Sequence, residues 1–594
     1  MIMENESEQY LNLLRANKEV GYDIESNGLQ WQICHVCGYG ISDGESSFYV
    51  PVRHQGGDNI TNIDAFEKEV SNIVANRTAP LIAHNAKFDM HFSENHGIKI
   101  KKIVDTMTIA ALLDENKFSY SLKNVCKGYD IEQKKDTELY KHLGGLFDCK
   151  TDHSAMAHYH RLSGKDPVGV EYAKSDNKAV YQLYQKQKRD LCAQNLEMVA
   201  GIESELTYVL QKMERKGIKI DIEAANKLKT EIDELLVEAY SVIPLSENLE
   251  VINVKSSKDL QKYFEYLGIN DWPVTDKGNP SFTKDYLGGK EEGEDILHAR
   301  KLKHFKNSFL DPLSSYIFND KIHTTFNQTI GEFGGARPGR LSSKGPNMQQ
   351  IPKRDKFTGE KFRKIFIADH GHSFVEFDYS QAEPRLFAHY SGEPILIEGY
   401  NKTPFIDMHS IASQYMNIER GAAKNLNLGI MYVMGALKLS VKLGITYEDA
   451  KTIVARWHKT FKKASSFTKH AAKVAETRGY VKTILGRRAR FTDPRFSYRA
   501  ANRIVQGGSS DILKYKLIEL NRWIETNNLD DKVQMILNIH DSILFQIRDD
   551  SFSYIKNIQD IMENVQIEPF SLKVPFVAEY QEIGKNWAET TYGK

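Results

Sequence analysis

Two largely apolar segments in the C-terminal half of the chain each contain a notable aspartate. The first, residues 374–378, ends at Asp378 and is followed by polar residues. The second, residues 535–545, is interrupted in its middle by His540 and Asp541. β-Branched, aromatic and other apolar residues in runs of this length predict buried β-strands. We therefore expect Asp378 at the end of one strand and Asp541 at the corner of a hairpin.

Carboxylates that rigid strands hold close together repel each other unless a cation lies between them. Two divalent metal ions about 3.5–4 Å apart are a common device for in-line phosphoryl transfer. Asp378 and Asp541 therefore predict a two-metal site. The pair alone is compatible with nucleases, phosphatases and polymerases.

Between these segments, four residues recur at a spacing of four and predict a stripe along one helix face. They are Arg420, Lys424, Leu428 and Tyr432. Two cations followed by two apolar groups suit a ligand with a triphosphate at one end and a flat base at the other. Standing alone, the stripe would more simply be an amphipathic helix with incidental charges.

The N-terminal third contains a second set of carboxylates. An alternating segment at residues 19–25 places two acids on one face of a predicted strand. A third acid follows a short apolar strand at residues 80–85, and a fourth shares one face of a predicted helix with a tyrosine. Singly, each pattern is common on protein surfaces. Together, Asp23, Glu25, Asp89 and Asp176 could form one cluster, with Tyr172 orienting water.

The composition is that of an ordinary globular protein. The chain has 594 residues, which suggests three to five structural units, and 41% of them are hydrophobic. Basic and acidic residues number 79 each, so the net charge does not indicate a nucleic acid partner. Residues 451–490, however, contain twelve basic residues, one acid and interleaved aromatic residues, which favours a polyanion-binding face.

Five cysteines in a chain of this size fit a reducing compartment better than a disulfide framework. Cys34 and Cys37 have a metal-like spacing, but they lie in an alternating segment, residues 31–39. This segment predicts a strand that would point the two thiols to opposite faces, so we do not expect a zinc site. The acidic N-terminus has no basic leader and no apolar run, which predicts a cytoplasmic protein.

The segments around these residues resemble known polymerase motifs. Residues 378–383, 420–432 and 540–541 resemble motifs A, B and C of the family A DNA polymerases, in the same order. Further matches surround Arg340 and residues 502–507. The N-terminal acids and Tyr172 resemble the three motifs of the DnaQ-like 3′→5′ proofreading exonucleases. The resemblance covers nearly the whole chain.

This resemblance implies a multidomain α/β fold, in which an RNase H-like exonuclease domain precedes a right-hand polymerase. The implied ranges are 1–190 for the exonuclease domain, 191–320 for the thumb, 321–390 and 495–594 for the palm, and 391–494 for the fingers. The short segment before Asp23 leaves no room for a 5′ nuclease domain. The thumb shows no insertion like the one by which some phage relatives bind thioredoxin. The layout is similar to that of bacteriophage enzymes, so we expect phage DNA replication in the bacterial cytoplasm.

The resemblance also implies two metal ions in each active site, with Mg²⁺ as the cofactor and Mn²⁺ as a substitute. In the polymerase site, the ligands would be Asp378, Asp541 and the carbonyl of Tyr379. In the exonuclease site, they would be Asp23, Glu25, Asp89 and Asp176.

The substrates implied are primer–template DNA and deoxynucleoside triphosphates, with a single-stranded 3′ end in the exonuclease site. Lys424 would act as the general acid, and Glu383 would exclude a ribose 2′-hydroxyl. The incoming nucleotide would also contact Arg420, Gln381, Leu428 and Tyr432. The DNA would contact Arg340, Asn502, Gln506 and His540. We expect a monomer with no membrane association, and the sequence indicates no particular helicase or replisome partner.

Three positions depart from the family pattern. Ser542 follows Asp541 where the family has glutamate, so we expect altered metal affinity but not loss of activity. Leu428 replaces an aromatic residue, which predicts discrimination against dideoxynucleotides. Pro384 replaces leucine and is expected to end a helical turn early.

Two other functions are compatible with parts of the pattern. One is a single-subunit RNA polymerase, which Glu383 and the complete exonuclease set disfavour. The other is an exonuclease whose polymerase half only binds DNA, and primer extension would distinguish it.

Overall fold

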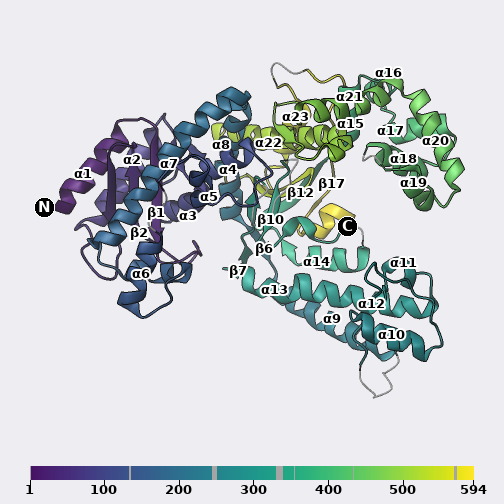
Figure 1. Ribbon diagram of the computed structural model, residues 1–594, viewed down its shortest axis with the longest axis horizontal. Helices are drawn as coiled ribbons and strands as arrows, with labels where there is room; N and C mark the ends of the chain where they lie inside the picture. Colours follow the sequence, from purple (N-terminus) through teal and green to yellow (C-terminus); the bar gives the residue numbers. More distant parts are fainter. Residues whose placement is uncertain are drawn as a thin grey trace.

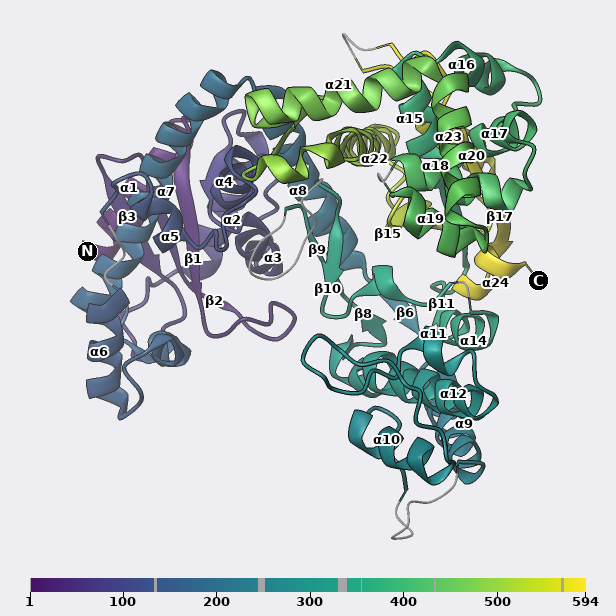
Figure 2. The ribbon, with the colours of Figure 1, turned by 45° about the vertical axis from the view of Figure 1, so that its right-hand side comes forward.

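The computed structural model describes residues 2–132, 136–243, 251–329, 339–353, 355–431, 434–567 and 571–593. A smaller N-terminal body lies at one end of the longest axis, and a larger body that contains the C-terminus lies at the other (Figure 1). Two helical arms extend from the larger body and are separated in both views (Figure 2). Within the described ranges, no helix is long and apolar enough to cross a bilayer.

The N-terminal body is built on a five-stranded mixed sheet in the order β3-β2-β1-β4-β5. β2 pairs antiparallel with β1 and β3, whereas β4 pairs parallel with β1 and β5. The prediction of a strand over residues 31–39 is wrong for its first residues, since β2 begins only at Val36. Before it, the N–H groups of Ile33 and Cys34 bond to the carbonyl of Gln30 and close a turn. The strands are β1 (Val20–Ser26), β2 (Val36–Ser42), β3 (Ser47–Pro51), β4 (Leu81–Ala83) and β5 (Ile103–Asp105).

Helix α7 packs against this sheet at two glycines. A Cβ atom at Gly21 or Gly40 would overlap Asn177 of α7, so these glycines allow the close approach of the helix. The helices of this body are α1 (Ile2–Arg15), α2 (Ile63–Asn76), α3 (Ala86–Asn95), α4 (Thr106–Leu113), α5 (Leu122–Lys127), α6 (Asp136–Phe147), the 3₁₀ segment η1 (His153–Arg161) and α7 (Pro167–Gln194).

The larger body is centred on a four-stranded antiparallel sheet in the order β15-β16-β12-β17. Nearly every residue of β12 and β16 is buried, which is the pattern of strands covered on both faces. The strands are β12 (His372–Tyr379), β15 (Val533–Ile539), β16 (Ser542–Arg548) and β17 (Ala578–Gly584). The accompanying helices are α8 (Glu197–Lys216), α15 (Ala382–Ser391), α22 (Ala500–Thr526), η7 (Phe552–Tyr554), α23 (Ile555–Glu563) and α24 (Trp587–Tyr592).

The lower arm in Figure 1 is mostly helical and continues into a small sheet in the order β11-β6-β8-β7. Its helices are α9 (Ile222–Ser241), α10 (Ser257–Tyr266), α11 (Lys284–Leu287), α12 (Glu291–Phe305), η2 (Lys306–Leu310), α13 (Asp311–Leu313), η3 (Ser314–Tyr316), η5 (Lys356–Glu360) and α14 (Lys361–Lys364). Its strands are β6 (Ile218–Ile220), β7 (Ile317–Phe318), β8 (Lys321–Ile322) and β11 (Phe366–Ile367). A separate pair of strands, β9 (Thr325–Asn327) and β10 (Ser342–Lys344), and the 3₁₀ turn η4 (Met348–Gln350) adjoin the arm.

The upper arm holds the basic segment at 451–490. Two of the aromatic residues interleaved with its cations, Trp457 and Phe461, are fully buried in the core and do not contribute to an open basic face. Three of its arginines are not on an open basic face either. Arg487 is buried, and Arg488 and Arg490 bind Gln194 and Glu115 of the N-terminal body. The other nine basic residues are exposed.

The elements of this arm lie between α15 and α22. They are α16 (Pro394–Asn401), α17 (Met408–Met416), α18 (Arg420–Met431), α19 (Ala436–Leu443), α20 (Tyr447–Thr460), α21 (Lys462–Arg478), β13 (Tyr480–Lys482), β14 (Arg488–Arg490) and η6 (Pro494–Arg499).

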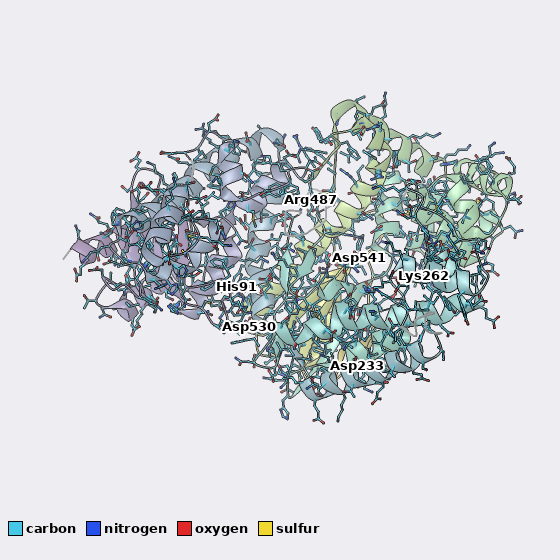
Figure 3. All side chains as sticks on the ribbon, turned by 60° about the horizontal axis from the view of Figure 1, so that its bottom comes forward. His91, Asp233, Lys262, Arg487, Asp530 and Asp541 are labelled. Carbon is cyan, nitrogen blue, oxygen red and sulfur yellow. The ribbon has the colours of Figure 1, made fainter. Side chains whose placement is uncertain are left out.

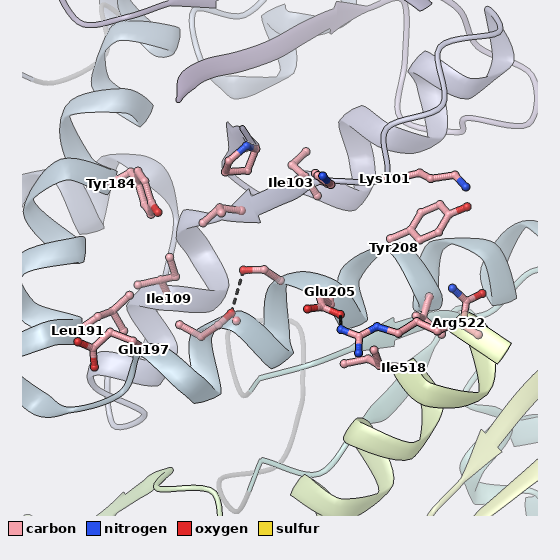
Figure 4. Close-up of a pocket in the computed structure, with 18 of the residues that line it drawn as sticks. Lys101, Ile103, Ile109, Tyr184, Leu191, Glu197, Glu205, Tyr208, Ile518 and Arg522 are labelled. Carbon is pink, nitrogen blue, oxygen red and sulfur yellow. Dashed lines mark hydrogen bonds and ion pairs between the residues drawn. The ribbon is translucent and has the colours of Figure 1, made fainter. Parts of the chain in front are cut away.

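A cavity of about 710 Å³ lies where α7 and α8 meet α22 (Figure 4). Apolar side chains such as Leu191 and Ile518 line it, and Glu205 pairs with Arg522 at its edge. None of the site residues expected from the sequence lines this cavity. It therefore belongs to the junction of the two bodies and not to either carboxylate site.

Candidate active sites

The central sheet brings the two opening aspartates to the same end. Asp378 is the penultimate residue of β12, and its register partner on β16 is Ser542. His540 and Asp541 form the two-residue turn between β15 and β16, as expected, with His540 at a φ of +56°. The backbone N–H of Tyr379 donates to the carbonyl of Asp541 at 3.4 Å. Figure 3 places Asp541 in the middle of the molecule.

The carboxyl group of Asp378 lies in an electrostatically unfavourable place. The residue is exposed, but the surrounding protein displaces water from its carboxyl group, and this desolvation raises its pKa to about 6. The negative charges of Asp541, Glu376 and Glu579 raise the pKa further, and the ammonium group of Lys353 opposes them. A cation between these carboxylates would relieve the repulsion.

The start of helix α15 holds the motif A glutamate. Glu383 lies in the first turn of α15, is 8% exposed, and forms an ion pair with Arg340. The Arg340 Nη2 atom is also 3.8 Å from the Asp541 carboxylate. The hydroxyl of Tyr400 donates to Gln381 Oε1 at 2.9 Å, which ties the residue that precedes α15 to α16.

The expectation that Pro384 ends a helical turn early was wrong. Helix α15 begins at Ala382 and continues to Ser391, so Pro384 occupies its first turn. The N–H groups of a first turn have no acceptor within the helix, and proline is therefore tolerated there.

The cationic stripe lies on α18 of the upper arm. Arg420 and Lys424 are exposed and Leu428 is half-buried, whereas the intervening Ala423 and Asn427 are buried. The fourth member of the stripe, Tyr432, lies outside the described residues. The helix is thus amphipathic, with Arg420, Lys424 and Leu428 of the predicted stripe on its more open face.

Buried hydrogen bonds fix the orientation of α18. The Asn427 side chain donates to the carbonyl of Met408 and accepts from the indole of Trp457 at 2.8 Å. Arg420 binds the carboxylate of Asp407 at 3.1 Å. Sequence reasoning did not identify Asp407, although it is an N-cap residue directly before α17.

The residues expected to contact DNA lie on two elements of the central body. Asn502 and Gln506 are half-buried and four residues apart on α22, so they share one face of this helix. His540 is exposed at the hairpin turn beside Asp541. In the proposed complex, the Asn502 and Gln506 face of α22 and His540 would border one DNA duplex without contacting each other.

The N-terminal carboxylates lie on the central strand β1 and on helices α3 and α7. Asp23 and Glu25 lie on the same face of β1, and Asp89 lies in the first turn of α3, where its carboxylate accepts the N–H of Ile24 at 3.1 Å. Asp89 is 1% exposed. Desolvation raises the pKa of Asp89 well above its ordinary value, and the charge of Asp23 adds to this effect.

Helix α7 adds the fourth carboxylate from above the sheet. Asn177 packs on Gly40, and Gly40 is the register partner of Asp23. The preceding Asp176 is 2% exposed, and Tyr172 lies one turn earlier on the same helix. Asp176 and Tyr172 therefore belong to the helix that packs closely on β1 at Gly21 and Gly40.

Both sites have the donor chemistry of a magnesium site. Hard cations such as Mg²⁺ prefer carboxylate and carbonyl oxygens, which are the groups present here. Among the described residues, no three His, Cys, Asp or Glu side chains are already grouped closely enough to hold an ion. Desolvation raises the pKa values of Asp89 and Asp378, repulsion from neighbouring carboxylates adds to both shifts, and a bound cation would offset these effects. The donor types of these residues therefore fit a divalent cation.

Two protein-family models match the chain. The model of DNA polymerase family A matches residues 221–589, which is more than half of the chain. The chain belongs to DNA polymerase family A. A 3′-5′ exonuclease model matches residues 3–191 of this polymerase. The family A DNA polymerase with a 3′-5′ exonuclease domain expected from the motifs is thus confirmed, and the RNA polymerase alternative is not supported.

Related polymerases align with nearly the whole of this chain. DNA polymerase DpoZ from Acinetobacter phage SH-Ab 15497 is 30% identical over 96% of this polymerase and 97% of the phage protein. DNA polymerase I from Synechocystis sp. is 27% identical over 97% of this chain and 60% of its own. The solved POL domain of Pol1 from M. smegmatis, in complex with DNA primer-template and dNTP, superposes with a TM-score of 0.82 at 23% identity and covers 98% of each chain. The polymerase fold is therefore shared.

Sequence reasoning missed two residues beside Asp378, namely Glu376 and Lys353. Glu376 is buried two positions before Asp378 on the same face of β12. Its position between apolar residues of a strand was a usable signal, since a buried carboxylate needs a partner. Lys353 lies 3.6 Å from Glu376, and its distance along the chain gave no signal.

Proposed function

We propose that this polymerase extends a DNA primer by two-metal phosphoryl transfer and removes mispaired 3′ ends in its exonuclease domain. The observation that carries the proposal is the position of Asp378 and Asp541 at one end of the central sheet. The Arg420 and Lys424 stripe is on the arm that lies between strands β12 and β15 of this sheet in the chain.

In the polymerase site, Asp378, Asp541 and the carbonyl of Tyr379 would hold Mg²⁺. When bound, the metal pair supplies the Lewis acidity and charge neutralisation that in-line phosphoryl transfer requires. Arg420 binds the triphosphate with its planar fork, and Lys424 gives a proton to the departing pyrophosphate.

Selection of the substrate depends on contacts to sugar, base and duplex. Glu383 excludes a ribose 2′-hydroxyl, while Gln381, Leu428 and Tyr432 border the incoming nucleotide. Arg340, Asn502 and Gln506 contact the minor groove, whose acceptors are nearly the same for every correct pair. His540 lies against the primer terminus. Closure of α18 over a correct pair completes the site, which is selection by induced fit.

In the exonuclease site, Asp23, Glu25, Asp89 and Asp176 would hold a second metal pair. Tyr172 orients the attacking water toward the terminal phosphodiester of a single-stranded 3′ end. The raised pKa of Asp89 supports this role, because desolvation and the charge of Asp23 oppose its ionisation and a bound cation would offset both.

The relatives support the proposed setting. Related phage polymerases suggest phage DNA replication in the cytoplasm of a bacterial host, and the complex of M. smegmatis Pol1 suggests primer–template DNA and dNTP as ligands. We propose a monomer with no thioredoxin dependence and with the domain ranges 1–190, 191–320, 321–390 with 495–594, and 391–494. The family model bounds at residues 191 and 221 support the first division.

The proposal is tested by two single variants assayed for both activities. Asp378→Ala is expected to lower primer extension on the order of a thousandfold and to leave 3′ degradation of single-stranded DNA intact. Asp23→Ala is expected to do the reverse. Extension that survives the first change, or degradation that survives the second, would contradict the site assignments. If the polymerase half only binds DNA, the Asp23→Ala protein will show no synthesis at all.

A further inference from the structure

The residue that occupies the place of the missing motif C acid is itself bonded to an acid. The hydroxyl of Ser542 lies 2.9 Å from Glu376 Oε1, within hydrogen-bond distance. It also lies 3.1 Å from the carbonyl of Ile539, so the turn and Glu376 share this one hydroxyl. The side chain of Ser542 is buried.

Strand register places this pair directly beside Asp378. Ser542 lies opposite Asp378, and Glu376 is two residues before Asp378 on β12. Side chains two apart on a strand share a face, and so do register partners on adjacent strands. Glu376, Asp378 and Ser542 therefore lie on one face, with Glu376 diagonal to Ser542. The register between β12 and β17 shifts at Glu376, a type of irregularity common next to active sites.

The two oxygens of Glu376 have different surroundings. Oε2 accepts the indole N–H of Trp587 at 2.8 Å and lies 3.4 Å from the Thr591 hydroxyl and 3.5 Å from the Arg363 guanidinium. Oε1 receives Ser542 and lies 3.6 Å from the ammonium group of Lys353. One oxygen thus anchors the carboxylate in the core, and the other faces the residues of the polymerase site.

We propose that Glu376 supplies, from β12, the negative charge that motif C of this chain lacks after Asp541. The acidic side chain thus lies on β12 instead of β16. Its hydrogen bond to Ser542 joins it to the position where the family has glutamate. Glu376 is a positioning residue, since it fixes Ser542 and the turn that carries Asp541 and adds its charge beneath Asp378. This inference rests on the two-metal site proposed above.

A purely structural role is the competing explanation. Arg363 could neutralise Glu376 as a buried ion pair that only stabilises the fold. The two explanations differ in what happens to metal affinity. If Glu376 is only structural, its substitution changes the melting temperature alone. If its charge acts next to the metal ligands, its substitution also changes the binding of a divalent cation.

The test is Mn²⁺ binding to the full chain with a 3′-dideoxy primer–template, measured from free Mn²⁺ by electron paramagnetic resonance. The binding lost in Asp378→Ala defines the polymerase site. Glu376→Gln is expected to weaken this binding by about ten- to a hundredfold. The transposed variant, Glu376→Ser with Ser542→Glu, is expected to restore it to within about threefold. Asp369→Asn is the matched control, since Asp369 is a paired carboxylate before the far end of β12 and should not affect Mn²⁺.

Parental Mn²⁺ affinity in a folded Glu376→Gln protein would overturn the inference. If that variant does not fold, the transposed variant decides, with restored affinity in support and lost affinity against. If neither variant folds, Ser542→Glu alone decides. A tenfold gain in its Mn²⁺ affinity, with Glu376 intact, would show that Glu376 does not already supply this charge and would overturn the inference. Parental affinity would support it. If Asp378→Ala itself leaves Mn²⁺ binding unchanged, the proposed metal site has failed, which is a different result.

Discussion

Arg340 forms an ion pair with Glu383 while its Nη2 atom lies 3.8 Å from the carboxylate of Asp541. One guanidinium thus contacts the residue proposed to exclude ribose and approaches a proposed metal ligand. In the proposed mechanism Glu383 faces the sugar of the nucleotide and Arg340 contacts DNA, so the ion pair between them would open when the substrates bind.

The first prediction concerns sugar selection. Glu383→Ala is expected to raise ribonucleotide incorporation relative to deoxynucleotide by about 10- to 200-fold, because the side chain that fills the space of the 2′-hydroxyl is removed. Single-nucleotide extension with each triphosphate measures the ratio. Glu383→Gln is the matched control, since it keeps the size and loses only the charge. If Gln relaxes the selection as much as Ala, charge and not size excludes ribose.

The strands that hold the aspartates were predictable because the information is local. Asp378 and the His540-Asp541 turn each follow from a few neighbouring residues, and the structure confirms both. The same is true of the helix face shared by Tyr172 and Asp176.

Contacts between residues distant in the chain were not predictable. The partners of Glu376 include Ser542 and Trp587, which are 166 and 211 residues away. Trp457 and Phe461 appeared to be interleaved with surface cations, but tertiary packing buries them. A periodic pattern identifies a face, but only the assembled fold shows what covers it.

The second prediction concerns the proposed general acid. Lys424→Ala is expected to lower the maximal rate of nucleotide addition by about 10²- to 10⁴-fold, because proton transfer to the leaving group is lost. Rapid-quench extension measures this rate, and 3′ degradation should be unaffected. Lys438→Ala, an exposed lysine of the neighbouring helix α19, is the control. Equal effects of the two changes would show that Lys424 acts only through general charge.

The third prediction concerns Leu428, which is half-buried on the open face of α18. The parental polymerase is expected to discriminate against dideoxynucleotides. Leu428→Tyr is expected to raise dideoxynucleotide use by about tenfold or more, since its hydroxyl replaces one hydrogen bond of the missing 3′-hydroxyl. Leu428→Phe separates the effect of the ring from that of the hydroxyl. Efficient dideoxynucleotide incorporation by the parental chain would refute this account.

The fourth prediction follows from the buried Asp89. Because its pKa is raised in the folded state, the metal-free protein loses stability as pH rises above the ordinary value of 3.8. Asp89→Asn removes this loss, so it should raise the melting temperature in EDTA at pH 7–8 by a few degrees, with little effect near pH 4. Added Mg²⁺ should stabilise the parental protein and reduce the difference. A variant that melts lower than the parent in EDTA would contradict the proposed repulsion.

A buried charge network joins helix α8 to helix α22 and to the upper arm within the larger body. Glu203 of α8 binds the ammonium group of Lys514 at 2.6 Å and pairs with Arg487, which in turn binds Asp511 at 2.7 Å. Burial alone would raise the pKa of Glu203, but the charges of Lys514 and Arg487 hold it below its ordinary value. Glu203 is 2% exposed, so its removal would leave two cations without a shared partner in the core.

The fifth prediction is therefore a large loss of stability in Glu203→Gln, of about 3–5 kcal/mol, because it leaves buried charge uncompensated. Glu205→Gln is the control, since Glu205 lies two residues further on the same helix and its ion pair with Arg522 is half-exposed. Its loss should be below about 1 kcal/mol. Denaturant unfolding followed by tryptophan fluorescence measures both. Because the pKa of Glu203 is lowered by folding, its contribution is present at neutral pH and should disappear as pH falls below 4.5, so the parental and Glu203→Gln curves should converge in acid. Equal losses in the two variants would show that the network is not a major source of stability in the larger body.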